Sequence, residues 1–178
     1  FFLTQMIVAY HWRDWKEADR YCDLSGEYQA DSQGMLHHAE HRFYEALLES
    51  REPSGSIRKN SGRKLRKLAG ANRLFLKLAE QCPENFQLRS LLLEAEVAAV
   101  ARRFDRASDY WHRAGRQLGD LQPWHLHAIA WRRLADHAGS EERVAYLQLA
   151  ADAYRMWGAS RIAASLESTL GDHSNQSG

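Results

Sequence analysis

The chain has 178 residues, 44% of them apolar, which suffices for one sizeable core or a short stack of helical repeats. Its 24 Lys and Arg residues balance 23 Asp and Glu residues, and the formal charge of +1 excludes a global field that draws nucleic acid or anionic membranes. No apolar stretch reaches the roughly 20 residues that span a bilayer, and no signal-peptide pattern appears. We therefore expect a soluble, cytoplasmic protein whose partners depend on local features.

Apolar residues recur at steps of three and four along nearly the whole chain, which predicts an all-α fold of about nine helices. In chain order, the expected helices cover residues 1–12, 15–28, 35–48, 65–79, 86–101, 107–118, 124–135, 144–157 and 162–170. The breaks carry helix-start or helix-stop residues, among them Asp14, Gly34, Pro83 and Gly158. Because most breaks are short, neighbouring helices are expected to run antiparallel.

We expect one helical repeat domain over residues 1–170. Within it, residues 52–62 (EPSGSIRKNSG) collect Pro, Gly, Ser and Asn without apolar periodicity, which predicts an exposed loop. Residues 171–178 lack apolar side chains and read as a disordered tail or linker. The chain opens with Phe1 rather than Met, so we expect a segment of a longer polypeptide.

A repeated spacing indicates the type of helix pair. Steps of three, four and three residues separate Phe104, Ala107, Trp111 and Ala114, and again Trp15, Ala18, Cys22 and Ser25. A looser copy contains Gly139, Val144, Leu147 and Ala150. Small residues in such a pattern allow close helix crossings, and large ones dock the next pair, as in degenerate tetratricopeptide repeats. The pattern predicts stacked helix pairs in a short right-handed solenoid, with Ala107 buried at a close crossing.

Three motifs in the C-terminal half carry a family resemblance: CPENF at 82–86, AEVA at 95–98, and YRMWGA at 154–159 followed by Leu166-Glu167. This half resembles the tetratricopeptide-like region of bacterial multidomain predicted ATPases and serine/threonine kinase–sensor histidine kinase proteins. The resemblance covers residues 82–170 well and continues more weakly back to residue 1. The chain departs from the pattern at Val100 and Arg102, where small residues are usual, and it lacks the Gly expected near Arg102-Arg103.

The resemblance implies a non-catalytic protein-interaction or sensor segment of a signal-transduction protein. Such a segment would couple the binding of a protein partner, a neighbouring domain or a small effector to an adjacent ATPase or kinase module. The alternative is an effector-binding or oligomerisation arm of a signal-transduction-ATPase-type transcriptional regulator. A third alternative, an enzyme of unrecognised type, finds no support in paired catalytic residues.

The basic stretch at residues 55–64 (GSIRKNSGRK) superficially resembles a phosphate-binding loop. It lacks the GxxxxGK spacing, and Leu65 stands where a magnesium-binding hydroxyl is needed, so we expect no ATP hydrolysis. Arg58, Lys59, Arg63 and Lys64 form a candidate basic docking patch, although a charge run at a helix start is more often a solvated face. Aromatic residues for base stacking are absent from it, and nucleic acid is therefore not an expected partner.

Potential metal and thiol sites are weak. His37 and His41 lie one helical turn apart, a spacing that can chelate a metal, but no third ligand and no HExxH arrangement accompany them. Cys22 and Cys82 have no CxxC partner and are interpreted as buried or inert thiols. We expect no metal, no cofactor and no catalytic residue.

The inner surface of the expected solenoid is the predicted partner-binding face. The first helix of each repeat pair lines this concave side and exposes residues that helix packing leaves unused. By the helical period, the candidates are Arg89, Glu96, Arg103, His127 and Arg132.

Overall fold

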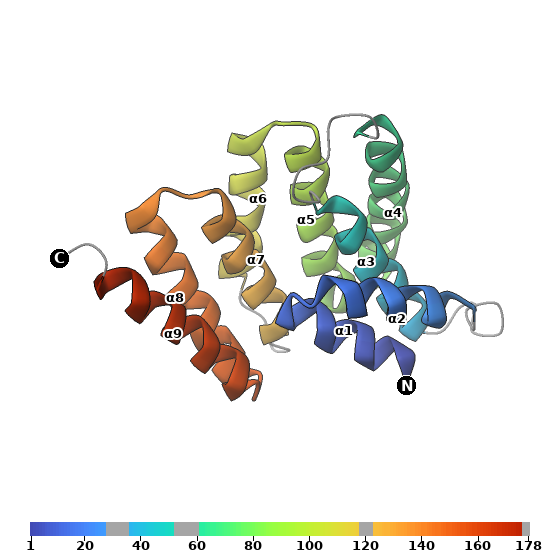
Figure 1. The fold of residues 1–178 in the computed structure, drawn as a ribbon. Helices are drawn as coiled ribbons and strands as arrows, with labels where there is room; N and C mark the ends of the chain where they lie inside the picture. The colour runs from blue at the N-terminus through green and yellow to red at the C-terminus, as the bar shows by residue number, and fades with distance from the viewer. Residues whose placement is uncertain (28–35, 52–60, 118–122, 176–178) are drawn as a thin grey trace. The chain divides into compact units, whose positions relative to one another are not determined.

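The computed structural model describes residues 1–27, 36–51, 61–117 and 123–175 (Figure 1). Over these residues the protein contains nine helices and no strand, which confirms the predicted all-α class. The chain divides into two compact units, Phe1–Phe104 and Asp105–Gly178. The expected break at Gly34 and residues 52–60 of the expected loop lie outside the described ranges.

Five helices build the first unit: α1 (Phe2–Trp12), α2 (Trp15–Glu27), α3 (Leu36–Ser50), α4 (Ser61–Gln81) and α5 (Pro83–Val100). Helix α1 packs on α2 and α4 packs on α5, while α3 contacts each of the other four. The short α1–α2 connection is encoded locally. Arg13 adopts a left-handed conformation (φ 59°) that ends α1, and the Asp14 carboxylate accepts a hydrogen bond from the Glu17 N–H at 3.2 Å, capping α2.

A row of rings joins four helices of the first unit, α1, α3, α4 and α5, and is continuous through the adjacent Phe43 and Tyr44 rings, whose centroids are 5.3 Å apart. Tyr10 of α1 meets Tyr44 of α3 with ring centroids 5.3 Å apart, and Phe43 of α3 meets Phe75 of α4 at 5.8 Å. Phe75 continues the row to Phe86 of α5 at 6.0 Å. These edge-on and tilted contacts are the geometries that aromatic pairs favour, so the row fixes α3 at the centre of this unit.

Four helices form the second unit: α6 (Phe104–Arg116), α7 (Trp124–His137), α8 (Ser140–Met156) and α9 (Ser160–Asn175), with Phe104 itself counted in the first unit. Helix α8 packs between α7 and α9. Helix α8 ends at Met156, and Gly158 follows two residues later with a φ of 86°, a conformation that glycine adopts without steric cost. The next N–H, of Ala159, donates to the Tyr154 carbonyl at 2.8 Å, which completes a Schellman-type end.

Some of the repeat positions are buried, while Phe104 and Val144 are exposed. Ala18, Ala107 and Ala114 are fully buried, and Trp111 is 1% exposed, whereas Phe104 is 40% exposed. The burial predicted for Ala107 is therefore confirmed. Of the two helices around this spacing, α5 belongs to the first unit, and all but the first residue of α6 belongs to the second.

Two segments expected to be non-helical are partly helical. Helix α4 begins at Ser61, so the last two residues of the expected 52–62 loop are helical, and α9 continues to Asn175, beyond the expected domain end at residue 170. Once a helix is nucleated, each added residue gains a backbone hydrogen bond, so helices extend past the last apolar residue. No helix in the described ranges is both long enough and apolar enough to cross a membrane.

Candidate functional site

A pocket of about 370 Å³ lies between α2, α3 and α4 of the first unit. Seven of its lining residues are charged; the full lining is Asp19, Cys22 and Asp23 from α2, Glu45, Leu48, Glu49 and Arg51 from α3 and its end, and Lys64 and Lys67 from α4. The spacing explains the arrangement, because helical residues three or four apart share a face. Each helix therefore presents its pair of charges to the same cavity.

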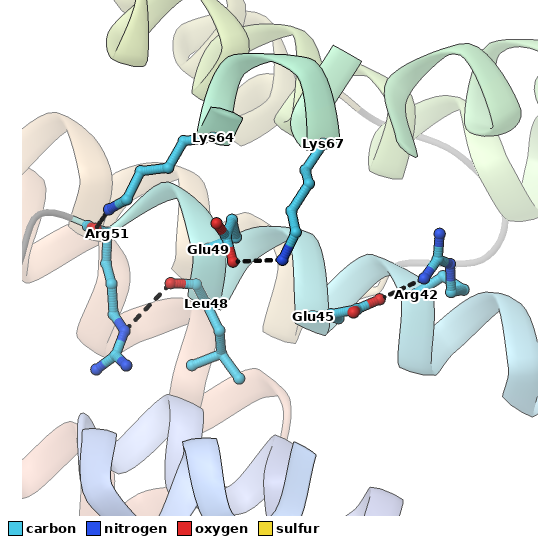
Figure 2. Close-up of polar contacts among 7 residues, drawn as sticks. All are labelled: Arg42, Glu45, Leu48, Glu49, Arg51, Lys64 and Lys67. Atoms are coloured by element: carbon cyan, nitrogen blue, oxygen red, sulfur yellow. Dashed lines mark hydrogen bonds and ion pairs between the residues drawn. The ribbon is translucent and has the colours of Figure 1, made fainter. Parts of the chain in front are cut away.

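All three lining cations are already engaged with the protein (Figure 2). Arg51 forms an ion pair with Asp19 of α2 and also donates from Nε to the Leu48 carbonyl at 3.1 Å. Lys67 Nζ lies 3.2 Å from Glu49 Oε2, linking α4 to α3. Lys64 Nζ donates to the Arg51 carbonyl oxygen at 2.9 Å. The cations thus tie the three helices together.

The carboxylates are less fully engaged. Glu45 pairs with Arg42 at 2.7 Å, on its own helix and outside the pocket lining (Figure 2). Asp23 is exposed and makes no ion pair to any described residue. Four lining carboxylates against three lining cations leave the pocket with surplus negative charge.

The surplus negative charge affects the pKa of the Cys22 thiol. Burial is the largest cause that raises its pKa to about 12, and the carboxylates of Glu45, Asp23 and Asp19 raise it further, while only Lys67 lowers it. A thiol with this pKa stays protonated near neutral pH and is a poor nucleophile. Cys22 is therefore a component of the pocket wall rather than a reactive group.

The predicted partner-binding residues of the first unit do not form one exposed face. Arg89 is largely buried in an ion pair with Glu40, N to O 2.7 Å, which joins α5 to α3. Glu96 is 1% exposed, and Arg103 is exposed in the connection that follows α5. Glu96 therefore cannot meet a partner at the surface as predicted, because the helical face assigned as free is turned toward the core.

The predicted residues of the second unit are also packed. His127 is 3% exposed, with its Nδ1 3.2 Å from the Gly115 carbonyl oxygen of α6. Arg132 donates to the Tyr154 hydroxyl at 3.2 Å, and its guanidinium lies 5.8 Å from the centre of that ring. The prediction of a free His127 side chain is wrong for the same reason as for Glu96: one residue of phase error rotates a helical position by about 100°.

The candidate basic patch is represented by two of its four residues. Arg63 is exposed in the first turn of α4, and Lys64 lines the pocket, whereas Arg58 and Lys59 lie outside the described residues. The pocket as a whole was not predicted from the sequence. Its signal was present as charge pairs at helical spacing, which matter only when three helices bring them to one cavity.

The histidines considered as metal ligands have separate environments. His41 is buried, and its Nε2 lies 3.2 Å from the Cys22 carbonyl oxygen, linking α3 to α2, whereas His37 is exposed. In the part of the chain that the structure describes, no three metal-ligating side chains come together.

Comparisons of the chain with protein-family models, with curated proteins and with solved structures give no match. The α2–α3–α4 pocket combines a cavity with accessible charged side chains from three described helices.

Proposed function

We propose that this chain is a non-catalytic protein-binding segment of a larger bacterial signal-transduction protein, and that its partner docks at the α2–α3–α4 pocket. The pocket is the observation that carries the binding role. The motifs at 82–86, 95–98 and 154–159 supply the signalling context, in which partner binding is coupled to a neighbouring ATPase or kinase module.

The pocket has two properties that favour binding, rigid walls and partly exposed charges. Its three walls are helices, with α2 and α4 both packed on α3, so a partner does not have to order them. Partly exposed charges steer encounter and select partners more than they add affinity. A surface of this kind suits regulated, specific and reversible binding.

The proposal extends to stacked tetratricopeptide-like helix pairs. The packed neighbours α1 with α2, α4 with α5, and α7 with α8 supply units of the required kind, and the buried Ala18, Ala107 and Ala114 occupy small-residue positions of the repeat. In such a stack, binding at one layer shifts its neighbours as rigid bodies. That coupling is what a sensor segment requires.

The test is a selection of displayed random peptides against the immobilised protein, followed by binding assays on variants. The pocket variant combines Asp23→Lys with Lys67→Glu, which preserves net charge but reverses two charges at the cavity. Its matched control combines Lys77→Glu with Glu80→Lys, which makes the same exchange at exposed positions of α4 outside the pocket lining.

Selected peptides should bind the wild type and the control variant but not the pocket variant, which must retain the wild-type helical spectrum. Peptides that bind all three proteins equally, or a selection that yields no binder, would overturn the proposal. A third variant replaces Arg58, Lys59 and Arg63 with Ser. Loss of binding in this variant alone would move the docking site to the basic patch.

A further inference from the structure

We infer that the α2–α3–α4 pocket recognises a basic segment of its partner, with a Lys or Arg side chain entering beside Asp23 and Glu45. This inference rests on the proposed function and specifies the chemistry of the occupant.

First, the charged groups of the cavity differ in how strongly they are already paired. An incoming anion must compete with Glu49 for Lys67, with Asp19 for Arg51, and with the Arg51 carbonyl for Lys64. An incoming cation meets Asp23, which pairs with no described cation, and Glu45, whose Arg42 partner comes from outside the lining. Binding a cation therefore breaks fewer existing contacts.

The second step is the sign of the field inside the cavity. Cys22 lies in the pocket wall, and three of the four charged groups that act on its thiol are carboxylates, all of which favour the protonated form. The group that opposes them, Lys67, is itself paired with Glu49. A field that disfavours a thiolate at this position favours an ammonium or guanidinium group.

The third step is the shape of the side chain that fits. Leu48 and the half-buried Cys22 provide a less polar part of the lining, while Asp19 and Asp23 are exposed. Lys and Arg side chains place their methylene stems along apolar surface and keep the charged group near water. A long basic side chain therefore matches both parts of the pocket.

The experiment compares three fluorescein-labelled peptides by fluorescence anisotropy. One alternates Lys with Ser and Gly, the second carries Gln in place of Lys, and the third carries Glu. The pocket variant in this experiment is a different one, Asp23→Asn with Glu45→Gln. It removes the charge of the two carboxylates while keeping the shape of their side chains. Its control, Glu80→Gln with Glu141→Gln, makes the same change in net charge at exposed positions outside the pocket.

The Lys peptide should bind most tightly to the wild type, and its Kd should weaken on the order of tenfold in the pocket variant, since two partly exposed charge contacts are lost. The control should change the Kd by less than about twofold, because distant surface charges are screened by salt. Binding of the Lys peptide should also weaken as salt rises.

Two results would contradict the inference. Tighter binding of the Glu peptide than of the Lys peptide would assign the pocket to acidic partners, and equal loss in the pocket variant and the control would reduce the effect to net charge. If displayed peptides still depend on the pocket in either case, the proposed function stands and only the basic occupant is wrong. If no peptide depends on the pocket, both fail.

Discussion

Polar groups lie between helices in both units, but in opposite ways. The first unit places them around the α2–α3–α4 pocket, and the second unit places them in a packed seam. In the pocket, charged side chains surround open volume and form ion pairs that are partly exposed. In the seam between α6, α7 and α8, the polar groups are ring nitrogens and a hydroxyl held among aromatic rings. The members of this aromatic seam are Trp111, His112, Gly115, His127, Trp131, His137 and Tyr146.

The seam is closed by direct ring contacts. Trp131 of α7 stacks on Tyr146 of α8 with planes 12° apart, and the Tyr146 hydroxyl lies 3.1 Å from His112 Nε2 of α6. A polar group fixed in this way stabilises one packing arrangement, whereas a polar group facing open volume can exchange its partner. The comparison therefore assigns stability to the seam and recognition to the pocket.

The largest effect is expected from emptying the seam. Trp111 is 1% exposed, stacks on His137 with ring centroids 5.2 Å apart, and lies 5.3 Å from the Arg133 guanidinium. Trp111→Ala should lower the free energy of unfolding by about 3–5 kcal/mol, because it removes a large buried ring and leaves a cavity. Urea denaturation followed by circular dichroism measures this. An unchanged midpoint would show that α6 is not held by this ring.

The reactivity of Cys22 tests how strongly the pocket field acts. With its pKa raised to about 12 by burial and by nearby carboxylates, the thiol should react with iodoacetamide at least roughly tenfold more slowly than a free cysteine at the same pH. The Cys82→Ser variant isolates this rate, and adding Asp23→Asn and Glu45→Gln should increase it. Reaction at the rate of free cysteine would mean that the cavity is wetter and less negative than described.

The helices could be predicted because the spacing of apolar residues is a local property of the sequence. Helix ends could be predicted where a glycine occupies the position after the helix that needs a positive φ. Gly158, at one of the predicted breaks, adopts φ 86° just after α8. At Arg102 the sequence lacks the expected Gly, yet the chain still adopts φ 62°, with the Arg103 N–H donating to the Ala98 carbonyl at 2.9 Å. A non-glycine residue can tolerate this conformation when the helix end is stabilised by such bonds.

The binding surface was harder to predict because it depends on which helices meet. Glu96 and His127 were assigned to a free face from periodicity alone, but both are buried. Asp23, Glu45 and Lys67 come from three helices and become one site only through the packing around α3. Charge pairs at helical spacing are common on solvated faces, so the sequence alone does not distinguish them.

Two glycines in helices should respond oppositely to alanine. A Cβ at Gly115 would lie 2.6 Å from Trp131 Cε2, whereas a Cβ at Gly70 of α4 would meet nothing within 4 Å. Gly115→Ala should be destabilising, since overpacking costs about 1–3 kcal/mol and the gain in helix propensity is at most about 1 kcal/mol. Gly70→Ala should stabilise by about 0.5–1 kcal/mol. Urea midpoints that shift in the same direction would contradict the close approach of α6 to Trp131.

Lowering the pH is expected to reduce the stability of the aromatic seam by a smaller amount. Burial is the main cause that lowers the pKa of His127, and hydrogen bonds to the Gly115 and Ala114 carbonyls only partly oppose it. Because the unfolded chain binds the proton more readily, stability is full above about pH 6.5 and is lost as the pH falls through the folded-state pKa. His127→Gln keeps a donor for Gly115 and should flatten the decline in Tm between about pH 7 and pH 5.

The control for this acid effect is His37→Gln, an exposed position in the first unit that should leave the slope of Tm against pH unchanged. Some slope should remain in the His127 variant, because burial and Arg116 also lower the pKa of His112. A slope in the His127 variant equal to that of the wild type would place the acid sensitivity elsewhere.

The smallest effect is expected from the pocket ion pair between Lys67 and Glu49. Their side chains are 51% and 29% exposed, so solvent screens a pair whose N–O distance is 3.2 Å. A double-mutant cycle with Lys67→Gln and Glu49→Gln should give a coupling of about 0.2–1 kcal/mol that shrinks as salt is added. A salt-independent coupling above about 2 kcal/mol is characteristic of a pair removed from water. That result would make the pocket as closed to solvent as the aromatic seam, contrary to the exposure of the Lys67 and Glu49 side chains.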